Sequence, residues 1–270
     1  MTTKQELKDV QNLYDERGID IQKVGIKNVE LPLIIQRKND DDQYVYAKAQ
    51  VSVNLPKNYK GTHMSRFMEI LNTWSQKHLL STDTKGFLTE IQKKLSASSA
   101  EVTFTFKYFI NKTAPVSKIN SQQGYECTFK GVLENKKYKF YLGVKVPITT
   151  LCPCSKEISQ YSAHNQRAIV TVNISYPEDK HIWIEDLIKL IEKHGSCEIY
   201  PLLKRRDEKY VTEKAYNNPK FVEDVTRDIV LELRNNEIIT EFEIEVESFE
   251  SIHNHSAWAY QKEIKNGVEK

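Results

Sequence analysis

The 270-residue sequence lacks any apolar run near the roughly 18 residues that a membrane-spanning helix requires. Its N-terminal region is polar and has no apolar centre of the kind that marks a secretory signal peptide. Four cysteines are too few for a disulfide framework in a chain of this length. These absences predict a cytoplasmic protein with reduced thiols and no membrane partner.

The sequence also lacks a glycine-rich phosphate loop. Gly143 and Gly195 are isolated, which excludes a P-loop mode of nucleotide binding. The net charge is +2, from 39 basic and 37 acidic residues, so no excess of one sign indicates a nucleic-acid partner, and none is expected. An anionic small molecule at a local basic patch remains compatible with this balance.

What is present is one order of elements that occurs twice. Alternating apolar residues predict strands at about 24–36, 44–55, 102–108, 125–133, 138–148, 168–176, 238–249 and 256–264. Apolar faces at helical spacing predict helices near 64–74, 87–95, 183–194 and 219–234, the last beginning at Pro219. The buried face of the first helix is predicted to consist of Met64, Phe67, Met68, Leu71 and Trp74.

The order strand-strand-helix-helix-strand-strand predicts an α+β protein of two similar halves, each an antiparallel sheet with two helices on one face. No glycine- or proline-rich linker separates the halves, so we expect one continuous sheet or core. We predict an N-terminal arm with helical spacing of apolar residues at 1–22, a first unit at 23–136, and a second unit at 137–270 that carries most site residues.

The segment from Leu151 to Arg167 is the most reactive stretch of the chain. It places two thiols one residue apart, at Cys152 and Cys154, and an imidazole at His164, on a predicted loop between two strands. Thiolate and imidazole are ligands that Zn²⁺ and similar metals prefer, whereas Cys-x-Cys is too tight for the usual closed zinc finger. The structural alternative is a pair of packed cysteines.

Three further polar segments lie in the second half, at 200–213, 218–227 and 250–259. Taken singly, the first is explained as a solvated charge run, the second as a surface carboxylate near a helix N-terminus, and the third as turn histidines. Their joint occurrence with the thiols and the imidazole favours a functional site in the second half.

The runs LCPCSKEISQYSAHNQR, YPLLKRRDEKYVTEKAYNNPKFVED and ESIHNHSAWA together resemble the GTP cyclohydrolases of type IB, over about residues 149–259. The resemblance implies the tunnelling fold, whose units assemble into oligomeric barrels with active sites at subunit interfaces, so a homo-oligomer (dimer or tetramer) is expected. It also implies a metal-dependent enzyme that converts GTP to 7,8-dihydroneopterin triphosphate and formate, the first step of folate-type pterin biosynthesis.

The resemblance implies the metal ligands Cys152, His164 and Glu208, with one position open for water. One divalent ion per active site is expected, and this ligand set accepts Zn²⁺, Mn²⁺ or Fe²⁺. The ion would supply hydroxide for attack on C8 of guanine.

The resemblance also implies that Glu223 recognises guanine, since a carboxylate accepts hydrogen bonds from N1–H and the 2-amino group. His253 and Glu250 are expected to transfer protons, and His255 to support substrate binding or proton transfer. Cys154 is a further catalytic candidate, or a disulfide partner of Cys152 when metal is absent. The cations expected to hold the triphosphate are Lys156, Arg167, Lys204, Arg205 and Arg206.

The sequence departs from the family pattern at Ser162, where the pattern has a glycine. Two alternatives to the predicted activity stay open. One is an archaeal-type GTP cyclohydrolase with a cyclic phosphate product, which would use the same ligands. The other is a noncatalytic, zinc-stabilised interaction module, which would have no need of Glu223, Glu250 or His253.

Overall fold

The computed structural model describes residues 8–79 and 83–265, which form two compact units. Unit 1 comprises Met1–Gln36, Tyr44–Phe104 and Lys130–Lys139, and unit 2 comprises Arg37–Gln43, Thr105–Phe129 and Phe140–Lys270. Three long strands carry residues of both units: β4 (Ser99–Thr113), β5 (Asn120–Glu134) and β6 (Lys137–Leu151). The predicted boundary at residues 136–137 falls in the turn between β5 and β6 and stays a prediction.

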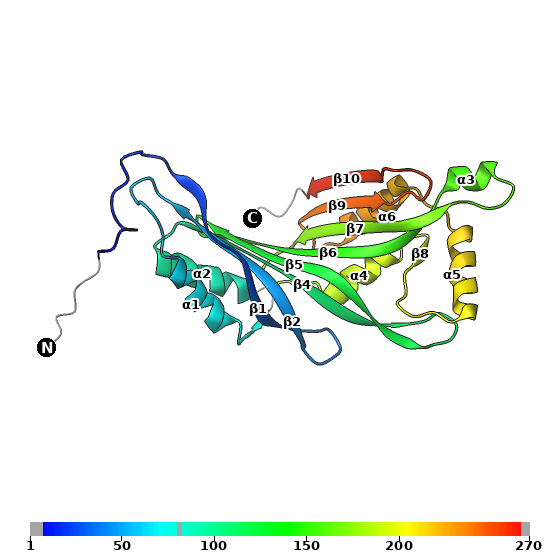
Figure 1. Ribbon diagram of the computed structural model, residues 1–270, viewed down its shortest axis with the longest axis horizontal. Helices are drawn as coiled ribbons and strands as arrows, with labels where there is room; N and C mark the ends of the chain where they lie inside the picture. Colours follow the sequence, from blue (N-terminus) through cyan, green and yellow to red (C-terminus); the bar gives the residue numbers. More distant parts are fainter. Residues whose placement is uncertain (1–7, 80–82, 266–270) are drawn as a thin grey trace. The chain divides into compact units, whose positions relative to one another are not determined.

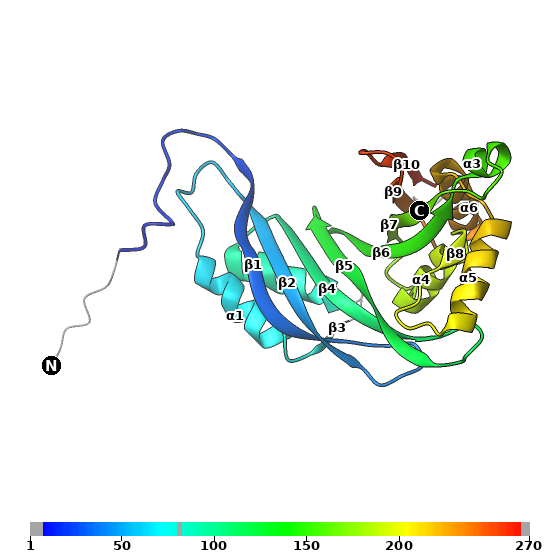
Figure 2. The same cartoon turned by 45° about the vertical axis from the view of Figure 1, so that its right-hand side comes forward.

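In unit 1 the strands lie in the order β6-β5-β4-β2-β1-β3, where β1 is Ile21–Ile35, β2 is Gln43–Leu55 and β3 is His78–Leu79. The helices α1 (Met64–Trp74) and α2 (Asp83–Leu95) lie side by side on one face of these strands (Figure 1 and Figure 2). The predicted alternation in β2 is confirmed, because its inward residues are all buried: Val45, Ala47, Ala49, Val51, Val53 and Leu55.

Two predictions for unit 1 are wrong. In α1 the buried stripe is Phe67, Ile70 and Leu71, whereas Met64 and Met68 are 41% and 45% exposed. The stripe has the i, i+3, i+4 spacing of a helix that faces the core, but it is rotated away from the two methionines. The expected helical spacing in the arm does not produce a helix over residues 8–20, and residues 1–7 lie outside the described part.

In unit 2 the strand order is β10-β9-β7-β6-β5-β4, with β7 (Asn165–Ser175), β9 (Glu241–Ser248) and β10 (Ala257–Ile264) in antiparallel pairs. The helices α4 (Ile184–Glu192) and α6 (Val222–Asn235) cover one face (Figure 1). Their predicted apolar stripes are buried, which confirms the α+β class. Within the described residues, no helix combines the length and apolar character needed to cross a membrane.

Two helices of unit 2 were not predicted: α3 (Pro153–Ile158) and α5 (Arg205–Asn217). The buried residues of α5 are Asp207 and Ala215, so this helix has no apolar stripe that periodicity could detect. The predicted start of α6 at Pro219 is also wrong, because α6 begins at Val222. The amide of Lys220 donates to the Leu151 carbonyl at 3.0 Å, which ties this segment to the end of β6 before the helix starts.

Candidate active site

A cavity of about 330 Å³ lies in unit 2, at one end of the strands β6, β7, β9 and β10. Its wall combines one thiol, three imidazoles, two carboxylates, one ammonium group and several hydroxyl, amide and apolar side chains. The lining residues are Thr150, Cys152, His164, Gln166, Lys220, Phe221, Val222, Glu223, Ser248, Glu250, His253, His255, Ala257 and Trp258.

The strand register brings these distant segments together. In the β6–β7 pair, Thr150 lies opposite Gln166, and in the pairs made by β9, Ser248 lies opposite both Ala168 and Ala257. The connections β6–α3–β7 and β9–β10 therefore emerge at the same end of the sheet (Figure 1). The cavity is formed where these connections meet the first turn of α6.

The predicted ligands Cys152 and His164 both line the cavity. Cys152 caps α3, where its Sγ accepts the Ser155 amide at 3.4 Å. The Nδ1 atom of His164 lies 2.8 Å from Gln166 Oε1 and 3.7 Å from a carboxylate oxygen of Glu250. A thiol and an imidazole on one wall suit a transition-metal or zinc ion.

The predicted proton-transfer residues lie on the same cavity. His253 and His255 stack with ring centroids 5.0 Å apart in the turn after β9. Glu250 accepts a hydrogen bond from Ser248 Oγ at 3.0 Å, so its carboxylate is held in one position. A carboxylate and two imidazoles in one cavity are residue types that general acid–base catalysis uses.

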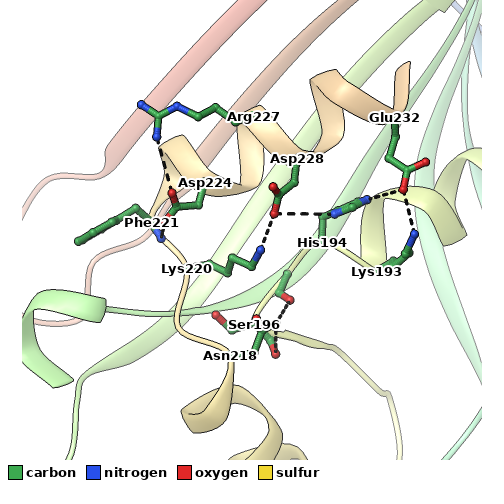
Figure 3. A network of polar contacts seen from close by, with 11 residues as sticks. Lys193, His194, Ser196, Asn218, Lys220, Phe221, Asp224, Arg227, Asp228 and Glu232 are labelled. Carbon is green, nitrogen blue, oxygen red and sulfur yellow. Dashed lines mark hydrogen bonds and ion pairs between the residues drawn. The ribbon is translucent and has the colours of Figure 1, made fainter. Parts of the chain in front are cut away.

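Glu223 lies in the first turn of α6 and lines the cavity, as predicted for a residue that recognises the base. Lys220 lines the same wall three residues earlier, and the sequence interpretation did not assign it. The Lys220 ammonium group pairs with Oδ2 of Asp228 (Figure 3). The same oxygen lies 4.0 Å from His194 Nδ1. His194 in turn approaches Glu232 at 3.5 Å, and Glu232 binds Lys193.

Seven predicted site residues do not line the cavity of the chain: Cys154, Glu208, Lys156, Arg167, Lys204, Arg205 and Arg206. Lys156 donates to the Tyr216 carbonyl at 2.6 Å and lies over the Tyr216 ring. Glu208 and its neighbouring cations are exposed at the start of α5. Within the described residues no group of three His, Cys, Asp or Glu side chains is placed to hold a metal ion.

The start of α5 is held by a buried carboxylate. Asp207 accepts the amides of Val116 and Ser117, each at 2.8 Å, and that of Lys204 at 2.9 Å. Burial raises the pKa of Asp207, but the hydrogen bonds from Ser117, Lys204 and Val116 outweigh burial and hold this pKa well below its ordinary value. The adjacent Glu208 is therefore carried on a helix start that is fixed by three hydrogen bonds.

The sequence interpretation missed four polar residues of the lining: Thr150, Gln166, Lys220 and Ser248. Three of them, Gln166, Thr150 and Ser248, link His164 to Glu250. Lys220 and Gln166 lie inside the blocks that carry the resemblance, so those blocks contained a signal. Thr150 and Ser248 are strand residues in alternating patterns, and only the register between strands shows that they meet.

The other two cysteines take no part in this site. Cys127 and Cys197 are buried, and burial raises the pKa of each thiol. All four cysteines are free thiols. The cavity lining contains one partly exposed thiol, Cys152, together with three imidazoles.

The fold matches that of solved uricases. The uricase from Arthrobacter globiformis superposes with a TM-score of 0.54 over 92% of this chain and 95% of the uricase chain, at 6% sequence identity. A likeness at this low identity concerns the fold alone. It establishes the tunnelling fold, a class of antiparallel sheets with helices on one face, as expected from the resemblance.

Sequence comparison identifies the family within this fold class. A family model for type I GTP cyclohydrolase folE2 matches residues 7–259. The GTP cyclohydrolase FolE2 of Thermosipho africanus is 51% identical over 94% of this chain and 96% of its own length. That of Geotalea uraniireducens is 49% identical over 98% of both chains. The chain belongs to the type I GTP cyclohydrolase folE2 family.

Proposed function

We propose that the cavity of unit 2 is the active site of a metal-dependent GTP cyclohydrolase, which hydrolyses GTP to 7,8-dihydroneopterin triphosphate and formate in the first step of folate-type pterin synthesis. The observation that carries the proposal is the single cavity shared by Cys152, His164, Glu223 and the Glu250–His253 pair. We further propose a cytoplasmic location, which agrees with four free thiols.

Guanine would be recognised at the start of α6. Its Watson–Crick edge presents two donors, N1–H and the 2-amino group, beside one acceptor, O6. Glu223 supplies a carboxylate for the donors, and Lys220, three residues away on the same wall, supplies a cation for O6. Adenine offers neither this donor pair nor this acceptor, so both contacts reject it.

A divalent ion would be held by Cys152 and His164, whose thiol and imidazole are suitable donors for Zn²⁺, Mn²⁺ or Fe²⁺. When bound, the ion would supply a hydroxide nucleophile near neutral pH. His253 and Glu250 would accept and return protons as the imidazole ring of guanine opens. Cys154 lies outside the cavity lining, and its catalytic role remains a prediction.

The third predicted ligand, Glu208, would come from a second copy of the chain. Tyr216, at the far end of α5, contacts Lys156 beside the cavity, and Glu208 lies eight residues earlier on the same helix. At about 1.5 Å per residue this separation is about 12 Å along the helix axis. An oligomer, dimer or tetramer, would place the exposed start of α5, with Lys204, Arg205 and Arg206, against a neighbouring cavity.

Complementation tests this shared site. C152A and E208A proteins are each expected to be inactive alone. Co-assembled mixtures should regain part of the wild-type turnover, because some interfaces then combine an intact Cys152 from one copy with an intact Glu208 from the other. A C152A and H164A mixture is the matched control, since both residues belong to one cavity, and it should regain nothing. Equal recovery in both mixtures, or in neither, would contradict the assignment of Glu208 to a second copy.

The activity itself is tested with metal-stripped protein and GTP, restoring Mn²⁺, Zn²⁺ or Fe²⁺ one at a time. Neopterin fluorescence after oxidation and dephosphorylation should appear only with metal, and product analysis separates the linear triphosphate from a cyclic phosphate. The E223Q variant should bind metal normally and lose turnover. Stoichiometric metal binding without turnover would favour the noncatalytic module.

A further inference from the structure

Five polar side chains of the cavity lining form a ring. Starting from His164, the ring passes through Gln166 (2.8 Å between Nδ1 and Oε1) and on to Thr150 (3.2 Å between Nε2 and Oγ1). It continues from Thr150 to Ser248, whose hydroxyl oxygens lie 3.0 Å apart, and from Ser248 to Glu250, also at 3.0 Å. The second oxygen of Glu250 lies 3.7 Å from His164 Nδ1 and closes the ring.

Four links of this ring are hydrogen bonds that run in one direction, from His164 to Glu250, whereas the 3.7 Å contact is longer than a hydrogen bond. The Ser248 hydroxyl donates its only hydrogen to Glu250, so the hydrogen between Ser248 and Thr150 must come from Thr150. Thr150 then accepts from the amide nitrogen of Gln166. With its nitrogen turned to Thr150, Gln166 presents an oxygen to His164, and this oxygen requires a hydrogen on Nδ1. The carboxylate of Glu250 therefore sets the tautomer of His164.

Thr150 and Ser248 are each only 1% exposed, so their hydroxyls take protein partners rather than bulk water. A purely structural role would explain the contact between Thr150 and Ser248, because two buried hydroxyls satisfy each other. It does not explain why this series of hydrogen bonds ends at His164, a predicted metal ligand, and at Glu250, a predicted proton-transfer residue, on one cavity. A histidine that binds metal through one nitrogen depends on the hydrogen bond made by the other.

We propose that Gln166, Thr150 and Ser248 are positioning residues that hold His164 as the Nδ1–H tautomer and so leave Nε2 free of hydrogen to bind a divalent metal. The proposal rests on the proposed function for the identity of His164 as a ligand. Removal of either hydroxyl frees the Gln166 amide to turn over. Its nitrogen would then donate to His164 Nδ1, and the hydrogen on the ring would move to Nε2, where it blocks the metal.

The tautomer can be read in the metal-free protein, without any activity. Nitrogen-15 spectra of histidine-labelled protein distinguish Nδ1–H from Nε2–H, and an H164Q variant assigns the signals. The wild type should show His164 as Nδ1–H alone, and T150V and S248A should show a substantial Nε2–H population. T150S keeps the hydroxyl and should restore the wild-type spectrum. An unchanged tautomer in T150V would overturn the proposal while leaving the proposed cyclohydrolase activity untouched.

Metal affinity gives an independent measurement. Competition of the stripped protein with a chromophoric chelator for Zn²⁺ should show affinity reduced about 10- to 100-fold in T150V and S248A, the range typical when a hydrogen-bond partner of a ligand is removed. T150S should remain near the wild type. T226V removes another buried hydroxyl, one bonded to the Val222 carbonyl in α6, and should leave affinity unchanged. Equal affinities in T150V and T226V would contradict the proposal.

Discussion

The backbone amide of Cys152 donates a 3.1 Å hydrogen bond to the backbone carbonyl of His164. The two predicted ligands are thus joined through their backbones, although twelve residues separate them in the sequence. The intervening segment, with α3 at its start, forms a loop whose two ends are joined by this hydrogen bond. The amide of His164 also donates a 3.1 Å hydrogen bond to Ser155 Oγ within this loop. These contacts of the protein itself hold the two ligands on one wall.

This arrangement predicts that removal of the Cys152 thiol affects metal binding and not folding. The C152S variant keeps an oxygen that can cap α3 in place of the sulfur, so the unfolding free energy should change little. Its affinity for Zn²⁺ should fall by more than about tenfold, because serine is a poor ligand for this ion. C154S is the matched variant, since Cys154 lies outside the cavity lining, and should bind like the wild type. Equal losses in both would mean that both thiols bind the metal.

Lys220 should contribute to recognition of GTP. Replacement in K220M removes a charged hydrogen-bond donor, a loss of about 1.5–3 kcal/mol that corresponds to about 10- to 150-fold in kcat/KM. K193M is a suitable control, because Lys193 also pairs with a carboxylate of α6 but lies at the far end of the network, outside the cavity lining (Figure 3). Steady-state kinetics should show the loss only in K220M. Parallel losses would indicate that the network as a whole, and not Lys220, supports activity.

The unfolding free energy should depend on pH through His194. Burial lowers the pKa of His194 below its ordinary value of 6.5, with Lys193 and Lys220 acting in the same sense and Asp228 and Glu232 opposing. The unfolded chain then binds a proton that the native chain does not. The stability contribution is complete above pH 6.5 and is lost as the pH falls below that value and through the lower native pKa.

Urea denaturation at several pH values, at fixed protein concentration, measures this effect. The unfolding free energy of the wild type should fall between about pH 8 and pH 5, and the H194N variant should show a smaller fall over the same range. Burial also lowers the pKa of His181. The H181N variant therefore measures the part of the pH dependence that comes from His181, and H194N measures the part that comes from His194. An identical slope for H194N and wild type would show that His194 titrates normally.

Ser162 should be a strained position. Its φ of 119° lies where side chains clash with the backbone and glycine does not. Glycine adopts this φ without strain, so S162G is expected to raise the unfolding free energy by about 1 kcal/mol. Gln160 is an exposed neighbour in the same loop that does not have a positive φ, and Q160G should bring no gain. Metal affinity should be unchanged in both variants. Destabilisation by S162G would mean that the serine side chain makes a compensating contact.

Local patterns predicted the regular elements well where apolar residues repeat. The alternation in β2 and the stripe Ile184, Leu187, Ile188 and Ile191 in α4 correspond to buried faces. The pattern failed for α5, whose buried anchor is the charged Asp207. It predicted α1 and the burial of Phe67 and Leu71 correctly, but it placed exposed Met68 on the buried face instead of Ile70, because methionine is compatible with either side of a helix.

The sequence by itself determined the α+β class, the family, and six residues that line the cavity: Cys152, His164, Glu223, Glu250, His253 and His255. The class follows from local periodicity, and the family and these six residues follow from the resemblance of three sequence blocks to a known family. Only the tertiary structure decided that Thr150, Gln166 and Ser248 connect His164 to Glu250, because strand register sets which side chains meet. It also showed that Glu208, at the start of α5, is not among the residues that line the cavity.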